Sequence, residues 1–347
     1  MSLSPQNIYR IATRGSMLAL WQARHVSALL ASKSVRTELN IIKTTGDAVQ
    51  DRFLHEIGGK GLFVRELEEA MVRGNAALAV HSLKDLPVNL PEGFSLPGVL
   101  PRHRSGDLFI IRKVVADALG LGSLSSPTNA PLLAADFAAF GAITIASSSL
   151  RRSCLLAAAA PKIKTVPVRG NVDTRLRKLA EGQFDAIILA EASVERLGQA
   201  LDTSPFVLRP IDTGWFIPCA GQGALAIEMF DRPELANLDE AVQQLSCEKT
   251  KRAVTMERAV LRTLGGDCTM PFGCHVTYAD GLWTGRAIVL DQKKNVARAE
   301  ISLLESQDPT SADEKLVRSL LNQLTEHGVA DVLRQLGLTV PPQFVRH

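Results

Sequence analysis

Apolar and polar positions recur with two different periods through the first hundred residues. The run Ile8–Thr13 predicts a strand, and from Ser16 onward large apolar residues recur on one helical face. A second strand is predicted at 35–41, a second amphipathic helix at Gly61–Arg73 and a short buried strand at Ala76–Val80. Strands that alternate with helices in this way predict an α/β domain.

The same alternation returns between residues 143 and 196, where each apolar run is followed by small polar residues and then by arginine. A helix N-terminus presents unpaired N–H groups, and guanidinium groups bind carboxylate or phosphate at two points. Successive junctions of this kind predict a site for several anionic groups. The apolar runs are Ile143–Ala146, Thr165–Val168 and Ala186–Ala190, and the arginines after them are Arg151, Arg152, Arg169, Arg175 and Arg196.

After residue 243 the pattern changes to a helix followed by consecutive strands. The first helix is predicted at Lys251–Leu264, and a last helix from Ser311, where Glu314 completes a capping box. This order predicts a smaller α+β domain with a three-stranded antiparallel sheet. The predicted strands are His275–Tyr278, Leu282–Leu290 and Val296–Leu304.

Length and shifts in composition predict three domains. The 347 residues exceed what one core usually supports. The stretch 113–141 is rich in Ala, Leu, Gly, Ser and Pro and indicates an insert, and a glycine turn at 220–224 indicates a return to the first domain. We therefore expect domain 1 at 1–112 plus about 220–242, domain 2 at 113–219 including that insert, and domain 3 at 243–347.

Composition limits the classes of function. A net charge of +3 is too small for a dedicated nucleic-acid-binding protein, so the arginines matter by position and indicate a small acidic substrate. Five scattered cysteines form no disulfide pattern and fit a reducing compartment. No apolar run suits a signal peptide or a membrane span. We expect a cytoplasmic monomer without membrane or nucleic-acid partners, or a plastid protein if a transit peptide has been removed.

Asp85 follows Lys84 at the end of the predicted strand 76–80, and ligands of open α/β sheets bind at such strand ends. An ionised carboxylate there could stabilise a developing positive charge. The alternative is a residue that caps the turn before Pro87.

Cys268 lies in the glycine-rich segment 265–273, which permits close approach by another group. The thiol is either a covalent attachment point or an inert buried cysteine. A zinc site with Cys274 and His275 lacks a second pair of ligands, so we expect no metal.

The arginines of the second series also have an alternative interpretation. They could lie on solvated helix faces and pair with Asp173, Glu181 or Glu195. Their repeated place after a strand favours anion binding. Arg14 and Ser16 hold the same position in the first series, and the loop around Lys60 adds backbone N–H groups and an ammonium.

In chain order, these segments resemble the porphobilinogen deaminase family, also called hydroxymethylbilane synthases. The resemblance covers nearly the whole sequence. The matching segments are 10–14 (RIATR), 58–63 (GGKGLF), 79–85 (AVHSLKD), 148–152 (SSLRR), 169–175 (RGNVDTR), 184–190 (FDAIILA), 221–224 (GQGA) and 268–273 (CTMPFG).

The resemblance implies two α/β domains like type II periplasmic binding proteins, a smaller α+β domain, and a dipyrromethane cofactor bound by a thioether to Cys268. It implies a transferase of haem biosynthesis that joins four porphobilinogen molecules head to tail, releases ammonia, and hydrolyses the product to hydroxymethylbilane. Asp85 would be the catalytic residue. Residues that would bind cofactor or substrate are Arg14, Ser16, Lys60, Phe63, Lys84, Ser147, Ser148, Ser149, Arg151, Arg152, Arg169, Gly170, Arg175, Leu189, Ala190, Arg196 and Gln222.

The arginine-rich pattern fits this chemistry independently. Each pyrrole carries two carboxylates, so a primer with four added units presents about twelve, and burying them requires many fixed cations. The alternative is a non-enzymatic clamshell protein that binds an anion. That alternative explains the arginines and two α/β domains, but it explains neither the third domain nor Cys268.

Overall fold

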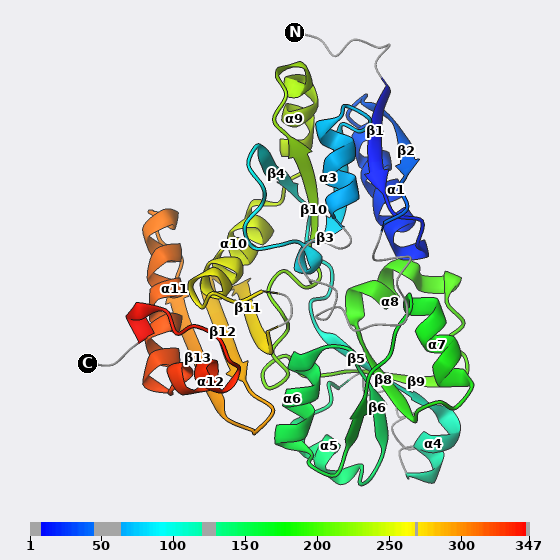
Figure 1. The fold of residues 1–347 in the computed structure, drawn as a ribbon, viewed down its shortest axis with the longest axis vertical. Coiled ribbons are helices and arrows are strands. Elements are labelled where there is room, and N and C mark those ends of the chain that lie inside the picture. Colours follow the sequence, from blue (N-terminus) through cyan, green and yellow to red (C-terminus); the bar gives the residue numbers. More distant parts are fainter. Residues whose placement is uncertain (1–7, 45–63, 120–129, 268–269, 345–347) are drawn as a thin grey trace. The chain divides into compact units, whose positions relative to one another are not determined.

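The computed structural model describes residues 8–44, 64–119, 130–267 and 270–344. The chain forms two compact units: unit 1 contains residues 1–103 and 223–251, and unit 2 contains residues 104–222 and 252–347. The described residues form three sheets, one in unit 1 and two in unit 2 (Figure 1).

The sheet of unit 1 has the strand order β2-β1-β3-β10-β4. β1 pairs in parallel with β2 and β3, whereas β10 is antiparallel to both β3 and β4. Its elements are β1 (Ile8–Thr13), α1 (Met17–Ala31), β2 (Arg36–Ile41), α3 (Arg65–Val72), β3 (Leu78–Ser82), the 3₁₀ turn η2 (Leu83–Asp85), β4 (Phe94–Val99), β10 (Leu225–Phe230), η5 (Pro233–Leu235) and α9 (Ala236–Gln243).

Alternation along the strands gives this sheet two buried faces. Ile11 and Leu78 pack in one cluster with Val26 of α1 and Leu238 of α9. Their strand neighbours face the other way, where Ala12 and Ala79 pack against the apolar side of α3. Helices therefore cover both faces, and α1 begins where expected, because the Ser16 hydroxyl accepts from the Ala19 N–H at 3.3 Å.

The five-stranded sheet of unit 2 repeats this plan with the order β7-β6-β8-β5-β9. β6 is parallel to β7 and β8, and β5 is antiparallel to β8 and β9. Two α/β sheets were predicted, and they are confirmed. The elements are β5 (Asp107–Arg112), α4 (Lys113–Ala118), α5 (Ala134–Ala139), β6 (Thr144–Ala146), α6 (Leu150–Ala159), β7 (Lys164–Val166), α7 (Val172–Ala180), β8 (Ala186–Ala190), α8 (Glu191–Leu197), η4 (Gly198–Ala200) and β9 (Phe206–Pro210).

Residues 104–141 differ from expectation in two ways. We placed residues up to 112 in domain 1, but β5 completes the second sheet by pairing with β8 and β9. The segment 113–141 is more than an insert, because it contains α4 and α5 and sends Phe137 and Phe140 into the core beside Phe109. Residues 120–129 lie outside the described part.

The C-terminal elements form a three-stranded antiparallel sheet in the order β11-β12-β13, as predicted, with α11 packed against it (Figure 1). Ile288 and Leu290 of β12 share a core with the preceding five-stranded sheet, so both sheets belong to unit 2. The three-domain division stays a prediction. The elements are α10 (Glu248–Thr263), β11 (Phe272–Ala279), β12 (Leu282–Leu290), β13 (Val296–Leu304), α11 (Pro309–Glu326), α12 (Val329–Gln335) and η6 (Pro342–Phe344).

Two predicted helix starts are wrong. α10 begins at Glu248 rather than at Lys251. α11 begins at Pro309 rather than Ser311, because the Asp308 carboxylate caps it by accepting from the Ser311 N–H at 3.2 Å. Proline fits the first helical position since it has no N–H to satisfy. Among the described residues, no helix combines the length and the apolar character needed to cross a membrane.

Candidate functional site

The strand-to-helix junctions of unit 2 lie at one edge of its five-stranded sheet. β6, β7 and β8 run parallel, and α6, α7 and α8 start within a few residues of their ends. The predicted pattern of strand, polar residues and helix is therefore confirmed at the first two junctions. At the third it is wrong, because α8 follows β8 directly and Arg196 lies in the last turn of α8. At the first, Ser149 caps α6 through the Arg152 N–H at 3.5 Å, and the Ser147 hydroxyl accepts from the Ser149 N–H at 3.2 Å.

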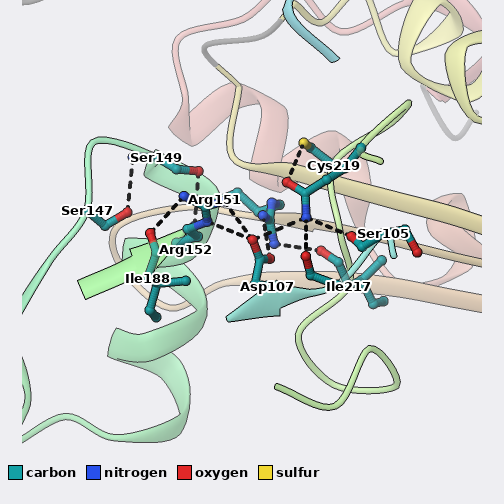
Figure 2. Close-up of polar contacts among 11 residues, drawn as sticks. Ser105, Asp107, Ser147, Ser149, Arg151, Arg152, Ile188, Ile217 and Cys219 are labelled. Atoms are coloured by element: carbon teal, nitrogen blue, oxygen red, sulfur yellow. Dashed lines mark hydrogen bonds and ion pairs between the residues drawn. The ribbon is translucent and has the colours of Figure 1, made fainter. Parts of the chain in front are cut away.

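Arg151 and Arg152, at the start of α6, converge on one carboxylate (Figure 2). Arg151 Nη2 lies 2.8 Å from Asp107 Oδ2, and Arg152 donates to Asp107 Oδ1 from Nε at 2.9 Å and Nη2 at 2.6 Å. These side chains are buried, with Asp107 only 1% exposed. Each arginine also donates to a backbone carbonyl, that of Ile217 at 2.9 Å and that of Ile188 at 3.0 Å.

This arginine cluster carries more positive than negative charge. Two guanidinium groups share the single carboxylate of Asp107. Burial disfavours the charged form of Arg151, but Asp107 and Cys219 outweigh it and raise the pKa of Arg151, so it stays protonated. Arg151 Nε is buried and has no hydrogen-bond partner among the described residues. Because excess buried charge is costly, this donor set fits an anionic group such as a carboxylate-bearing cofactor.

Gln222 supports the arginine cluster through Asp107. Its fully buried amide nitrogen donates to Asp107 Oδ1 at 3.2 Å and to the carbonyls of Ser105 at 2.7 Å and Gly106 at 3.0 Å. The Cys219 thiol donates to the side-chain amide oxygen Oε1 of Gln222 at 3.5 Å. Gln222 therefore joins the segment before β10 to the start of β5.

Glu257 of α10 fixes the residue next to Gln222. It is completely buried, and it accepts from the Gly221 N–H at 2.7 Å and from the Val276 N–H at 2.8 Å. One carboxylate thus ties α10 to β11 and to the segment that leads to the arginine cluster.

Replacement of Glu257 by glutamine should therefore lower the free energy of unfolding by about 1–3 kcal/mol, because an amide NH₂ must then face a buried N–H. Urea unfolding measures this loss. Glu314→Gln, on an exposed position of α11, is the control and should change stability by less than about 0.5 kcal/mol. Equal stabilities of the two variants would contradict the bonding scheme.

Most of the other predicted residues of unit 2 lie at the ends of the same strands, whereas Arg196 lies in the last turn of α8. Arg175 Nε donates to the Gly170 carbonyl at 2.7 Å, and the Ser148 hydroxyl bonds Val168. Gly170 has φ of +106°, and a Cβ there would lie 2.7 Å from Thr174, so only glycine fits. Leu189 and Ala190 are buried in β8, Arg196 is buried, and Arg169 is half-buried. Their contacts with a ligand stay predictions.

In unit 1 the predicted residues share an edge of the first sheet. β1 and β3 are parallel, so Arg14 and Ser16 after β1 lie at the same edge as Lys84 and Asp85 in η2. The Asp85 side chain is exposed to solvent. Among the described residues, no group of three or more His, Cys, Asp or Glu could hold a metal ion. Lys60, Phe63 and Cys268 lie outside the described residues.

Sequence reasoning missed Asp107 and Glu257. Asp107 is the one acidic residue beside the apolar run 108–111, and Glu257 lies on a face of α10 shared with Ala253 and Leu261. An isolated acid in an otherwise buried pattern is the signal that could have found them, because such a charge needs a partner.

The fold and site define an α/β protein with two five-stranded sheets and a net positive cluster at the strand ends of the second. The family model for the porphobilinogen deaminase, dipyromethane cofactor binding domain, matches residues 9–237, and the model for the porphobilinogen deaminase C-terminal domain matches residues 251–326. The chain belongs to the porphobilinogen deaminase family.

Porphobilinogen deaminases from other organisms align with almost the whole chain. Porphobilinogen deaminase of Nitratidesulfovibrio vulgaris (strain Miyazaki F) is 40% identical over 331 residues, which cover 94% of this chain and 96% of the relative. That of Paraburkholderia phymatum is 39% identical over 336 residues, which cover 96% and 94%. These matches do not favour the alternative of a non-enzymatic clamshell protein, and both relatives are bacterial, which gives the plastid expectation no support.

Solved structures show a weaker likeness. The VFT2 domain of BvgS from Bordetella pertussis (double mutant) has a TM-score of 0.38 at 16% identity, covering 69% of this chain and 86% of its own. Substrate-binding domain 2 of GlnP from Lactococcus lactis has a TM-score of 0.39 at 14% identity, covering 76% and 94%. At this level the likeness carries no conclusion about ligand or activity.

Proposed function

We propose that the protein is a hydroxymethylbilane synthase, a transferase that joins four porphobilinogen molecules head to tail on a dipyrromethane primer and then hydrolyses the product to hydroxymethylbilane. The observation that carries this proposal is the match of both family models in chain order, over residues 9–237 and 251–326. A monomeric, cytoplasmic enzyme stays our expectation.

The buried excess of positive charge supports the proposal. Every pyrrole of substrate and product carries an acetate and a propionate, and charge-assisted bonds to guanidinium are the strong ones. Arg151 and Arg152 together retain one positive charge beyond Asp107. The N-termini of α6 and α7 start at the same sheet edge and add N–H donors. These groups would hold the carboxylates of the primer and of the growing chain.

The primer would be attached by a thioether to Cys268, as the family resemblance implies. When bound, the dipyrromethane supplies a free pyrrole carbon as nucleophile. Among the chain's own residues, the arginines would hold the carboxylates of this group.

Asp85 would act on porphobilinogen itself. Loss of ammonia leaves a cation delocalised onto the pyrrole nitrogen, and an adjacent carboxylate stabilises that charge by ion pairing and by accepting the N–H. Asp85 is exposed at the sheet edge where Lys84 and Arg14 could hold the substrate's acid groups. Its place in η2, the turn that directly follows β3, supports this role.

The mass of the intact, freshly purified protein tests the proposal. We expect an excess of two pyrrole units over the polypeptide, lost in Cys268→Ala together with turnover of porphobilinogen. Cys247→Ala, which removes a half-buried thiol before α10, is the matched control and should keep both. A wild-type mass equal to the polypeptide alone, without porphobilinogen consumption after attempted reconstitution, would refute the assignment.

A further inference from the structure

A group of ionisable side chains lies on the face of the unit 1 sheet that α3 covers, and the reaction outlined above does not use it. His81 Nε2 of β3 lies 2.9 Å from Glu228 Oε2 of β10 in the buried interior. His81 is 8% exposed and Glu228 is fully buried. Glu68 of α3 interacts electrostatically with both. We call these three residues the Glu68 cluster.

The surroundings of the cluster are apolar, so its charges are costly to bury. Ala79 is the register partner of Glu228, and Leu67 and Met71 of α3 pack on the same face. Neither Glu228 oxygen accepts a hydrogen bond of normal geometry from the described residues. Apolar side chains would generally stabilise such a position at least as well as a buried ion pair does. The cluster is therefore poorly explained as a source of stability alone.

Glu68 can exchange a proton near neutral pH. Partial burial, then the charge of Glu228, raise the pKa of Glu68 from 4.5 to about 7, against an opposing effect of His81. Other charged groups of α3 are Glu66, one of whose oxygens is buried, and Glu69, which pairs at the surface with Arg65 and Arg73.

The strands packed against α3 bring few further charges. β1 contributes Arg10, whose guanidinium bonds Glu38 at 2.7 Å at an exposed position. Within β3 and β10 the ionisable residues are His81 and Glu228 themselves. Among the described residues of these elements, Glu68 is thus the group with a raised pKa beside the buried pair.

The cluster is joined to Asp85 by a short, hydrogen-bonded stretch of backbone. His81 pairs with Ala226 of β10, and β3 ends one residue later. The Leu83 N–H then donates to the Ala224 carbonyl at 3.0 Å, and η2 delivers Asp85 directly afterwards. The turn that carries Asp85 is therefore bonded to β10 two residues beyond His81.

We propose that Glu68, His81 and Glu228 are positioning residues for Asp85, and that proton exchange at Glu68 makes kcat depend on pH. The proposal rests on the function assigned above. With Glu68 neutral, His81 has Glu228 as its one carboxylate partner in the cluster. Ionised Glu68 adds a second carboxylate, which competes for His81 and repels Glu228, so the β3–β10 pairing and the Asp85 turn shift.

Proton binding at Glu68 also makes the stability of the fold depend on pH, in a direction that follows from the shift of its pKa. The pKa of Glu68 is about 7 in the folded protein against 4.5 for the free side chain, so the folded state holds more protons between these values. Its contribution to stability is full below pH 4.5 and is lost as pH rises through about 7. Glu68→Gln, which stays neutral, should gain thermal stability relative to wild type as pH increases across neutrality.

The test compares the holoenzyme as wild type, Glu68→Gln and the control Glu69→Gln, with kcat, KM and Tm measured from about pH 5.5 to 8.5. We expect an inflection in kcat near pH 7 in the wild type and in Glu69→Gln, and its loss in Glu68→Gln. Glu228→Gln removes one cause of the raised pKa, so its inflection should move to lower pH.

Superimposable kcat profiles of wild type and Glu68→Gln would overturn the inference while leaving the proposed function intact. A wild type that consumes no porphobilinogen at any pH would overturn the proposed function instead. In that case Tm still tests proton exchange at Glu68. A Tm difference between wild type and Glu68→Gln that is the same at every pH would show that Glu68 does not exchange a proton in this range.

Discussion

Replacement of Asp85 by asparagine should lower kcat for porphobilinogen by at least about 10²–10³-fold without unfolding the protein. Asparagine keeps the size of the side chain and can still accept an N–H, but it cannot neutralise the cation left by ammonia. Asp85 is exposed and ends the short turn η2, so its charge is not needed for the core. Ammonia release and the thermal melt measure the two effects.

The matched control for this prediction is Asp117→Asn, which removes an exposed carboxylate on α4 of unit 2. Its kcat should stay within about twofold of wild type. The intact mass of Asp85→Asn should still include the primer, which separates a loss of chemistry from a loss of cofactor attachment. Turnover of Asp85→Asn close to that of wild type would remove Asp85 from the mechanism.

Asp107→Asn should destabilise the protein by about 3–5 kcal/mol, the largest loss expected from a single isosteric change. The substitution leaves Arg151 and Arg152, 3% and 7% exposed, without the carboxylate that both now share. Two like charges then remain in the interior, with backbone carbonyls and the Cys219 thiol as partners but no carboxylate. Urea unfolding followed by tryptophan fluorescence reports this change, because Trp215 and Trp283 lie in unit 2.

An exposed ion pair of the same unit supplies the comparison. Glu181→Gln breaks the Arg177–Glu181 pair on the surface of α7 and should cost less than about 0.5 kcal/mol. If Asp107→Asn lowers the free energy of unfolding by no more than this, water or another group must compensate the charges of the two arginines. The interpretation of this cluster as a buried excess of positive charge would then be wrong.

Local patterns predicted much of the fold. Ile8–Thr13 and Val296–Leu304 form strands with the expected bounds, and Ser16 caps α1 as its position suggested. The strand-to-helix junctions around Ser149 and Asn171 were also visible in the sequence, because the small polar residues and the apolar runs that mark them are adjacent in the chain.

Partners distant in the chain could not be predicted in this way. Nothing local shows that Arg151 and Arg152 both bond Asp107, or that β5 pairs with β8. An arginine at a helix start is equally suited to a ligand carboxylate and to an internal one. The same limit applies to His81, whose partner Glu228 is brought beside it by the antiparallel pairing of β3 and β10.

The position of β10 has a consequence for synthesis on the ribosome. This strand lies between β3 and β4, yet it comes from residues 225–230, after all five strands of the second α/β sheet. The second sheet is contiguous in the chain and is complete once Pro210 has emerged. The N-terminal sheet cannot be completed until β10 has been synthesised, because β10 lies between β3 and β4. The second sheet can therefore form first, although N-terminal domains generally fold first during synthesis.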